Sequence, residues 1–356
     1  MSHDPKTPPR AGEMLHLRSR ELQPGEPVSP PLIQSSMYHL PGNPEGLAGY
    51  GRSDNATWEC TEQVLEHLEE APCVLFPSGM AAISAALFAC LGAGDRLLVP
   101  SDGYYTTRLL AENFLAGLGV QIETRATSDF AAGGFEGFRA VFIETPSNPG
   151  LDVIDIAAVA RAVRAAGGVT IVDNTTMTPF GQKPLALGAD VVVASDTKAP
   201  GGHSDVLMGH VASRDAALLG RVREWRKLTG AIPGPVEAWL LHRGLETLEV
   251  RFERMCNSAE IIATRLAGHS KVHALRYPGL PDDPAHNLAA AQMIRFGFLC
   301  HVTLASAELA DRFIEECPLL QPATSFGGVH SSAERRVRWG DAVDPGQPDR
   351  DDLPGP

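Results

Sequence analysis

The chain has 356 residues, of which 44% are hydrophobic and 21% are charged, a composition typical of a globular protein with two domains of ordinary size. Its formal net charge of −13 excludes a general attraction to nucleic acid or anionic membranes, and no apolar run is long enough to predict a membrane span. The N-terminus lacks the apolar core of a signal peptide and the six cysteines form no CxxC pair. We therefore expect reduced thiols in a cytoplasmic protein, with zinc binding or disulfides as the alternatives.

The first half of the chain predicts an open α/β sheet. Residues 1–50 are rich in Pro and Gly and predict an extended arm, followed by helical spacing over 57–70. Short apolar runs then alternate with helical stretches such as 80–91 and 156–166. The expected strands are 73–76, 96–99, 140–143, 169–172 and 190–194. Apolar runs without polar alternation are typical of parallel strands that are buried on both faces.

The pattern changes after about residue 240. A long amphipathic helix is expected over 245–268, followed by shorter segments that include 298–304 and 308–317. We predict an N-terminal arm (1–50), a large cofactor-binding domain (51–243), a smaller α+β domain (244–340) and a disordered tail (341–356).

Polar residues follow the predicted strands at their C-terminal ends, where ligands bind in an open α/β sheet. Ser78, Gly79 and Met80 open a helix whose free N–H groups favour a phosphate, although a Ser-Gly pair is also an ordinary helix cap. Asn148 follows a strand in an Asn-Pro pair, which is otherwise a plain turn.

Asp173 and Lys198 end two further strands. A carboxylate at the end of a buried strand needs a partner, which a protonated pyridine nitrogen would supply; a metal ligand or helix cap is the alternative. Lys198 is one of only five lysines, and burial would lower its pKa and make it nucleophilic, whereas a surface lysine would stay solvated. A phosphate site, an acid and an amine are together what pyridoxal 5′-phosphate (PLP) requires.

These segments resemble the Cys/Met-metabolism PLP enzymes, a family that includes cystathionine γ-lyase, cystathionine γ-synthase, cystathionine β-lyase and methionine γ-lyase. The similarity runs over about residues 30–340 and is carried above all by Ser-Asp-Thr-Lys198-Ala-Pro-Gly-Gly-His-Ser-Asp, Tyr50-Gly-Arg52, Glu-Thr-Pro-Ser-Asn148-Pro-Gly and Val-Asp173-Asn-Thr. It is strongest to the bacterial cystathionine γ-lyase branch. The resemblance implies the fold type I architecture of the PLP-dependent transferases, which is aspartate aminotransferase-like.

The resemblance also implies roles for individual residues. Lys198 would form the Schiff base and move protons, Asp173 would pair with the pyridinium, and Tyr104 would stack on the ring and act as acid and base at the leaving sulfur. The phosphate would be bound by Ser78, Gly79, Met80, Ser195 and Thr197, and by Tyr50 and Arg52 of a neighbouring subunit. Asn148 would lie near the ring oxygen and Ser325 at the substrate's amino-acid end. The sharing of sites implies a homo-oligomer, a tetramer built from dimers, with a small sulfur amino acid as substrate and no metal.

The sequence departs from the family in two places. Thr106 stands where methionine γ-lyases commonly have Cys, which disfavours that activity. The family's carboxylate-binding Arg, in an Ile-Arg-Phe-Ser strand, has no direct counterpart; Arg338 and Arg350 are the stand-ins, and a solvated basic face is the alternative for the cluster around Arg338.

The resulting hypothesis is α,γ-elimination of L-cystathionine to cysteine, 2-oxobutyrate and ammonia. γ-Replacement, β-elimination and methionine cleavage remain the enzymatic alternatives, and a catalytically silent PLP-binding subunit is the alternative of another class.

Overall fold

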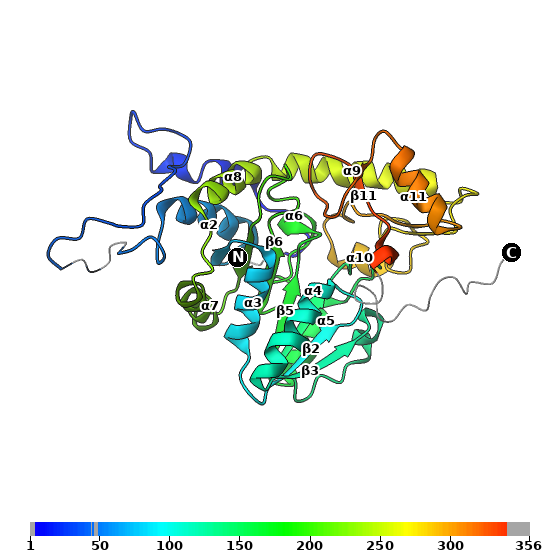
Figure 1. Cartoon of the computed structure of the whole chain (residues 1–356), viewed down its shortest axis with the longest axis horizontal. Coiled ribbons are helices and arrows are strands. Elements are labelled where there is room, and N and C mark those ends of the chain that lie inside the picture. The colour runs from blue at the N-terminus through cyan, green and yellow to red at the C-terminus, as the bar shows by residue number, and fades with distance from the viewer. Residues whose placement is uncertain (1–3, 44, 46–48, 340–356) are drawn as a thin grey trace.

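A seven-stranded sheet forms the centre of the computed structural model, which describes residues 4–43, 45 and 49–339 (Figure 1). In spatial order its strands are β1 (Cys73–Phe76), β7 (Gly209–Ala212), β6 (Val191–Ser195), β5 (Val169–Asp173), β4 (Ala140–Glu144), β2 (Arg96–Pro100) and β3 (Gln121–Arg125). The strands from β6 to β3 run parallel, and β7 is antiparallel to both of its neighbours. The predicted α/β fold with a mostly parallel sheet is confirmed.

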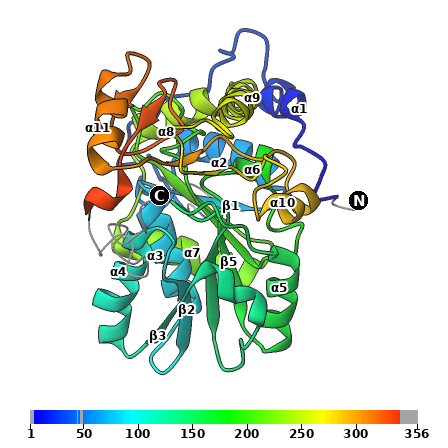
Figure 2. The same ribbon diagram turned by 90° about the vertical axis from the view of Figure 1, so that its right-hand side faces the viewer.

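Helices cover both faces of this sheet, which is why its strands are apolar without interruption (Figure 2). One face packs against α3 (Gly79–Cys90) and α7 (Ala216–Thr229), with α4 (Tyr105–Leu110) beside them. The other face packs against α5 (Ile156–Ala165) at one side and against α2 (Ala56–Glu69), α6 (Thr178–Gly181) and α8 (Pro235–Leu245) at the other.

The chain after α8 forms a smaller group of elements, which lies above the sheet in Figure 2. It contains α9 (Leu248–Leu266), β8 (Ala274–Arg276), α10 (His286–Gln292), β9 (His301–Thr303), α11 (Ala307–Glu316), β10 (Gln321–Pro322) and β11 (Ser332–Ala333). The helix expected over 245–268 begins at Leu248. The residues before it belong to the end of α8, because the N–H groups of Glu246 and Thr247 bond to carbonyls within α8. Gly244 in that helix approaches the chain after Lys198 so closely that a Cβ would lie 2.5 Å from the Pro200 oxygen.

The N-terminal region is less extended than expected. It contains a short helix, α1 (Ala11–Leu15), whose Ala11 and Met14 are buried against the core next to α2. The predicted tail, 341–356, lies outside the described residues, and the domain boundaries remain a prediction. Among the described residues, no helix is long and apolar enough to cross a membrane.

Candidate active site

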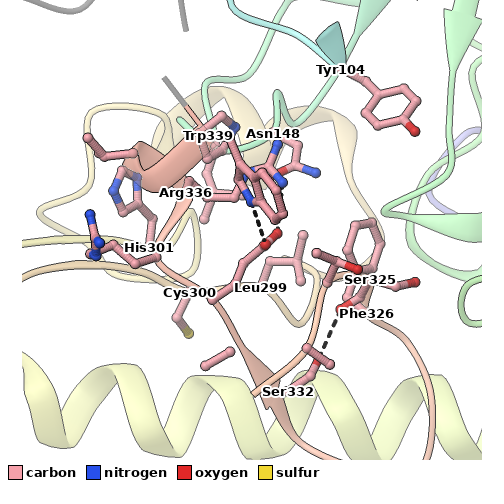
Figure 3. Close-up of a pocket in the computed structure, with 18 of the residues that line it drawn as sticks. Tyr104, Asn148, Leu299, Cys300, His301, Ser325, Phe326, Ser332, Arg336 and Trp339 are labelled. Carbon is pink, nitrogen blue, oxygen red and sulfur yellow. Dashed lines mark hydrogen bonds and ion pairs between the residues drawn. The ribbon is translucent and has the colours of Figure 1, made fainter. Parts of the chain in front are cut away.

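A cavity of about 1430 Å³ opens at the C-terminal edge of the parallel strands. The structure brings most of the predicted site residues to its wall: Ser78, Gly79, Met80, Tyr104, Asn148, Asp173, Ser195, Thr197, Lys198 and Ser325. Strands β1, β4, β5 and β6 point the same way, and their C-terminal ends lie at this edge of the sheet. The residues that follow these strands therefore converge, although they are far apart in sequence. Figure 3 shows Tyr104, Asn148 and Ser325 around the cavity.

The start of α3 forms part of the cavity wall, and we call Ser78, Gly79, Met80, Ser195 and Thr197 the cradle. Ser78 caps the helix by accepting a hydrogen bond from the Ala81 N–H at 3.1 Å, which leaves the first N–H groups of the helix facing the cavity. Gly79 lies against Ser195 so tightly that a Cβ would be 2.6 Å from the Ser195 Cβ. Close approach of two backbones and a helix N-terminus are the features that suit a phosphate.

The amine and the acid line the same cavity. Lys198 Nζ donates a hydrogen bond to Ser325 Oγ at 2.7 Å, and Phe326 lies with its ring centroid 5.0 Å from the same nitrogen. Burial lowers the pKa of Lys198, against the opposing charge of Asp173. Burial raises the pKa of Asp173, although its Oδ1 accepts the Thr175 N–H at 2.9 Å. Burial therefore disfavours the charged form of both groups, and the Asp173 carboxylate would be stabilised by a cationic partner.

Glu144 is a site residue that the sequence reasoning missed. It is buried at the end of β4, in register with Asp173 at the end of β5, and it accepts the backbone N–H of Tyr104 at 2.5 Å. Burial and the charge of Asp173 hold its pKa well above the usual range. Glu144 thus holds the backbone of Tyr104, the residue that precedes α4, in place. The signal that identified Asp173, a carboxylate after a buried strand, is also present here.

Some predicted residues lie away from the cavity in this single chain. Tyr50 is exposed, and Arg52 donates to the Lys227 carbonyl at 2.9 Å, so neither lines the wall. Arg338 does not line it either: its guanidinium lies over the Trp339 ring at 4.9 Å. Arg350 lies outside the described residues.

Arg336, two residues before Arg338, does line the cavity (Figure 3). Its Nη1 pairs with Glu334 Oε1 at 2.7 Å. Its Nε is buried and has no hydrogen-bond partner among the described residues. The positive charge of Arg336 also contributes to the lowered pKa of Lys198, which places it within electrostatic reach of the amine. Arg336 therefore lines the cavity, while its buried Nε–H has no partner among the described residues.

Comparisons with known proteins agree with this geometry. Residues 12–338 match the family described as Cys/Met metabolism PLP-dependent enzyme. A Streptomyces coelicolor protein with the provisional name cystathionine gamma-lyase is 48% identical over 329 residues, which are 90% of this chain and 83% of that protein. The cystathionine beta-lyase of Lactococcus lactis is 36% identical over 86% of this chain and 82% of its own length.

Solved structures show the same fold. The crystal structure of cystathionine gamma synthase from Xanthomonas oryzae pv. oryzae, in complex with aminoacrylate and cysteine, has a TM-score of 0.89 and 34% identity. The alignment covers 95% of this chain and 89% of that one. The fold type I architecture that the resemblance implied is confirmed.

Proposed function

Since this chain belongs to the family of Cys/Met metabolism PLP-dependent enzymes, it is a PLP-dependent C–S lyase, and we propose that its reaction is the α,γ-elimination of L-cystathionine. The products would be cysteine, 2-oxobutyrate and ammonia. The 48% identity to the Streptomyces relative, which carries the provisional name cystathionine gamma-lyase, supports γ-elimination. The observation that carries this proposal is that Lys198 and the buried Asp173 line one cavity, whose wall also includes the N-terminus of α3.

The residues present fit PLP. Asp173 is a buried carboxylate whose pKa is raised by burial, and a pyridinium nitrogen would supply a compensating positive charge. The N-terminal N–H groups of α3 and the hydroxyls of Ser195 and Thr197 would hold the phosphate. When bound, PLP supplies an electron sink for the carbanion that forms at the substrate's Cα.

The protein's own groups would move the protons. Lys198 Nζ, whose pKa is lowered by burial and which donates to Ser325 Oγ, would take the proton from Cα and then transfer protons at the neighbouring carbons. Tyr104, whose backbone is fixed by Glu144, would donate its hydroxyl proton to the leaving sulfur as the Cγ–S bond breaks. Cysteine would then leave as a neutral thiol.

Arg336 is the proposed anchor for the substrate's α-carboxylate, in the place that Arg338 was expected to take. Arg336 lines the cavity within electrostatic reach of Lys198, and a guanidinium suits a carboxylate. Its Nε–H is buried without a partner among the described residues, so a rotation of the side chain would bring this donor to the carboxylate. Glu334, which bonds to Nη1, would hold the guanidinium in this orientation. Anchoring the carboxylate would orient the Cα–H bond toward Lys198.

The assembly and location of the protein are also part of the proposal. Tyr50 and Arg52 lie away from their own cavity, which fits the family pattern in which they reach the phosphate of a neighbouring subunit. We expect a homo-oligomer built from such dimers, a tetramer, in the cytoplasm. Sedimentation of the wild type, and PLP binding by Arg52→Ala, would test the shared site.

The product assay decides the reaction. Purified, PLP-loaded protein is given L-cystathionine and all four candidate products are quantified. Cysteine with 2-oxobutyrate supports γ-elimination, and homocysteine with pyruvate assigns β-elimination instead. An absence of all four from a PLP-bearing protein would contradict the lyase reaction and favour the silent subunit.

A further inference from the structure

A fully buried histidine links the turn that carries Lys198 to helix α2. His210 lies on β7, and its Nδ1 is 2.9 Å from both carboxylate oxygens of Asp196. Its Nε2 is 3.3 Å from Glu69 Oε1, near the end of α2. The residue exposures are 1% for His210, 0% for Asp196 and 6% for Glu69, so water cannot replace these contacts. The active-site chemistry described above uses none of the three residues.

The geometry favours a protonated imidazole. Each ring nitrogen faces a carboxylate oxygen, and an ionised carboxylate only accepts, so both nitrogens donate in the imidazolium form. Burial alone would lower the pKa of His210, but the charges and hydrogen bonds of Asp196 and Glu69 outweigh it and raise the pKa to about 10. The thiol of Cys73 faces the same cluster from β1, and burial holds its pKa well above the ordinary value, so it stays neutral.

Asp196 connects the network of His210, Asp196 and Glu69 to the active site. It lies between Ser195 and Thr197, which line the cavity, and two residues before Lys198. Its backbone carbonyl accepts the Gly201 N–H at 2.7 Å, closing the turn from the far side of the lysine. The side chain of Asp196 therefore connects the turn to the sheet, while its backbone holds the turn together.

We propose that His210 is a positioning residue, which acts through Asp196 to fix the turn that presents Lys198 and the phosphate-binding hydroxyls. Loss of the His210–Asp196 bond would free a buried carboxylate to move away from Glu69, and the turn would move with it. The proposal depends on the PLP role of Lys198 but not on which sulfur amino acid is cleaved.

Two amide substitutions at His210 distinguish its contact with Asp196 from its contact with Glu69. In His210→Asn the amide nitrogen takes approximately the place of Nδ1 and can still donate to Asp196. In His210→Gln it takes approximately the place of Nε2 and can still donate to Glu69, but the bond to Asp196 is lost. Both variants remove the same charge from the same buried position, so a general loss of stability affects both.

A matched control comes from another buried ion pair on α2. Glu62 bonds to Arg226 at 2.6 Å and to the Leu75 N–H at 2.8 Å, but it does not contact the lysine-bearing turn. Glu62→Gln reports what the weakening of a buried pair on this helix does to stability alone.

The readouts are the rate of PLP release from each holoenzyme, the pH titration of its visible absorption band, and the thermal midpoint. We expect His210→Gln to release PLP about tenfold faster and to shift the absorption titration. His210→Asn and Glu62→Gln should stay within about twofold of the wild type in release, whatever their loss of thermal stability.

Equal release from the Asn and Gln variants, whether fast or slow, would overturn the proposal, because the link to Asp196 would then have no separate effect. If His210→Gln does not fold, Asp196→Asn tests the same link: release at the wild-type rate from that variant would also overturn it. Since PLP release is measured without substrate, failure of cystathionine cleavage leaves this test intact.

Discussion

Gly209→Ala tests whether the cradle at the start of α3 holds the cofactor phosphate. A Cβ at position 209 would lie 2.7 Å from Gly79 Cα, Gly79 N and the Ser78 oxygen, all of them backbone atoms. Ordinary contact begins near 3.4 Å, so the strand and the helix start must separate by about 0.7 Å. Strain of this kind costs about 1–3 kcal/mol, which corresponds to about a 5- to 150-fold weaker Kd for PLP if binding requires the native spacing.

The assay is an absorbance titration of the apoprotein with PLP and, separately, with pyridoxal, which lacks the phosphate. We expect Gly209→Ala to weaken PLP binding strongly and pyridoxal binding little. Gly220→Ala is the control, because a Cβ in that position of α7 meets nothing within 4 Å, and it should stabilise the helix by about 0.5–1 kcal/mol. Equal weakening for both ligands, or unchanged PLP binding, would refute the assignment of the cradle.

Three further predictions concern charged side chains. Lys198→Ala should abolish the borohydride-stable pyridoxyl adduct in intact-mass spectra, and an adduct of wild-type yield would show that another amine carries PLP. Arg336→Gln should lower kcat/KM by about 10- to 100-fold, whereas Arg338→Gln should stay within about threefold; the reverse order in steady-state assays would restore Arg338 as the anchor. His210 has a folded-state pKa raised from 6.5 to about 10, so its stabilisation is complete below the lower value and declines as pH rises through the upper one. Chemical denaturation between about pH 7 and pH 10 should therefore show a steeper loss of unfolding free energy in wild type than in His210→Gln, and parallel curves would contradict the protonated state.

The parallel sheet and much of the candidate site could be predicted because their signals are local. Buried parallel strands are apolar without interruption, and each chemical group follows its strand within a few residues, as Asp173 and Lys198 do. The edge strand β3 escaped prediction because its outward residues are polar, as in Gln121 and Glu123. The antiparallel strand β7 is short and includes a histidine, which an apolar-run criterion rejects.

The missed side-chain relations depend on tertiary structure. Glu69 and His210 are distant in sequence, and neither residue type identifies the other without the fold. Arg336 and Arg338 are close neighbours in one short helix, Arg336–Trp339, so sequence alone could not tell which faces the cavity and which lies over Trp339. Glu144 differs from these, because its strand-end position was visible in the sequence.

The pairing of β1 with β7 has a consequence for the order in which the protein can fold during synthesis. Cys73 is in register with Ala212, about 140 residues later, and β1 pairs with no other strand in the part of the chain that the structure describes. Its pairing edge therefore stays open until β7 has left the ribosome. At about 5–20 residues per second, that interval lasts roughly 7–28 s. The nascent chain must therefore carry the apolar strand β1 unpaired for this time, and a chaperone that shields exposed strand edges would raise the yield of folded protein most during this interval.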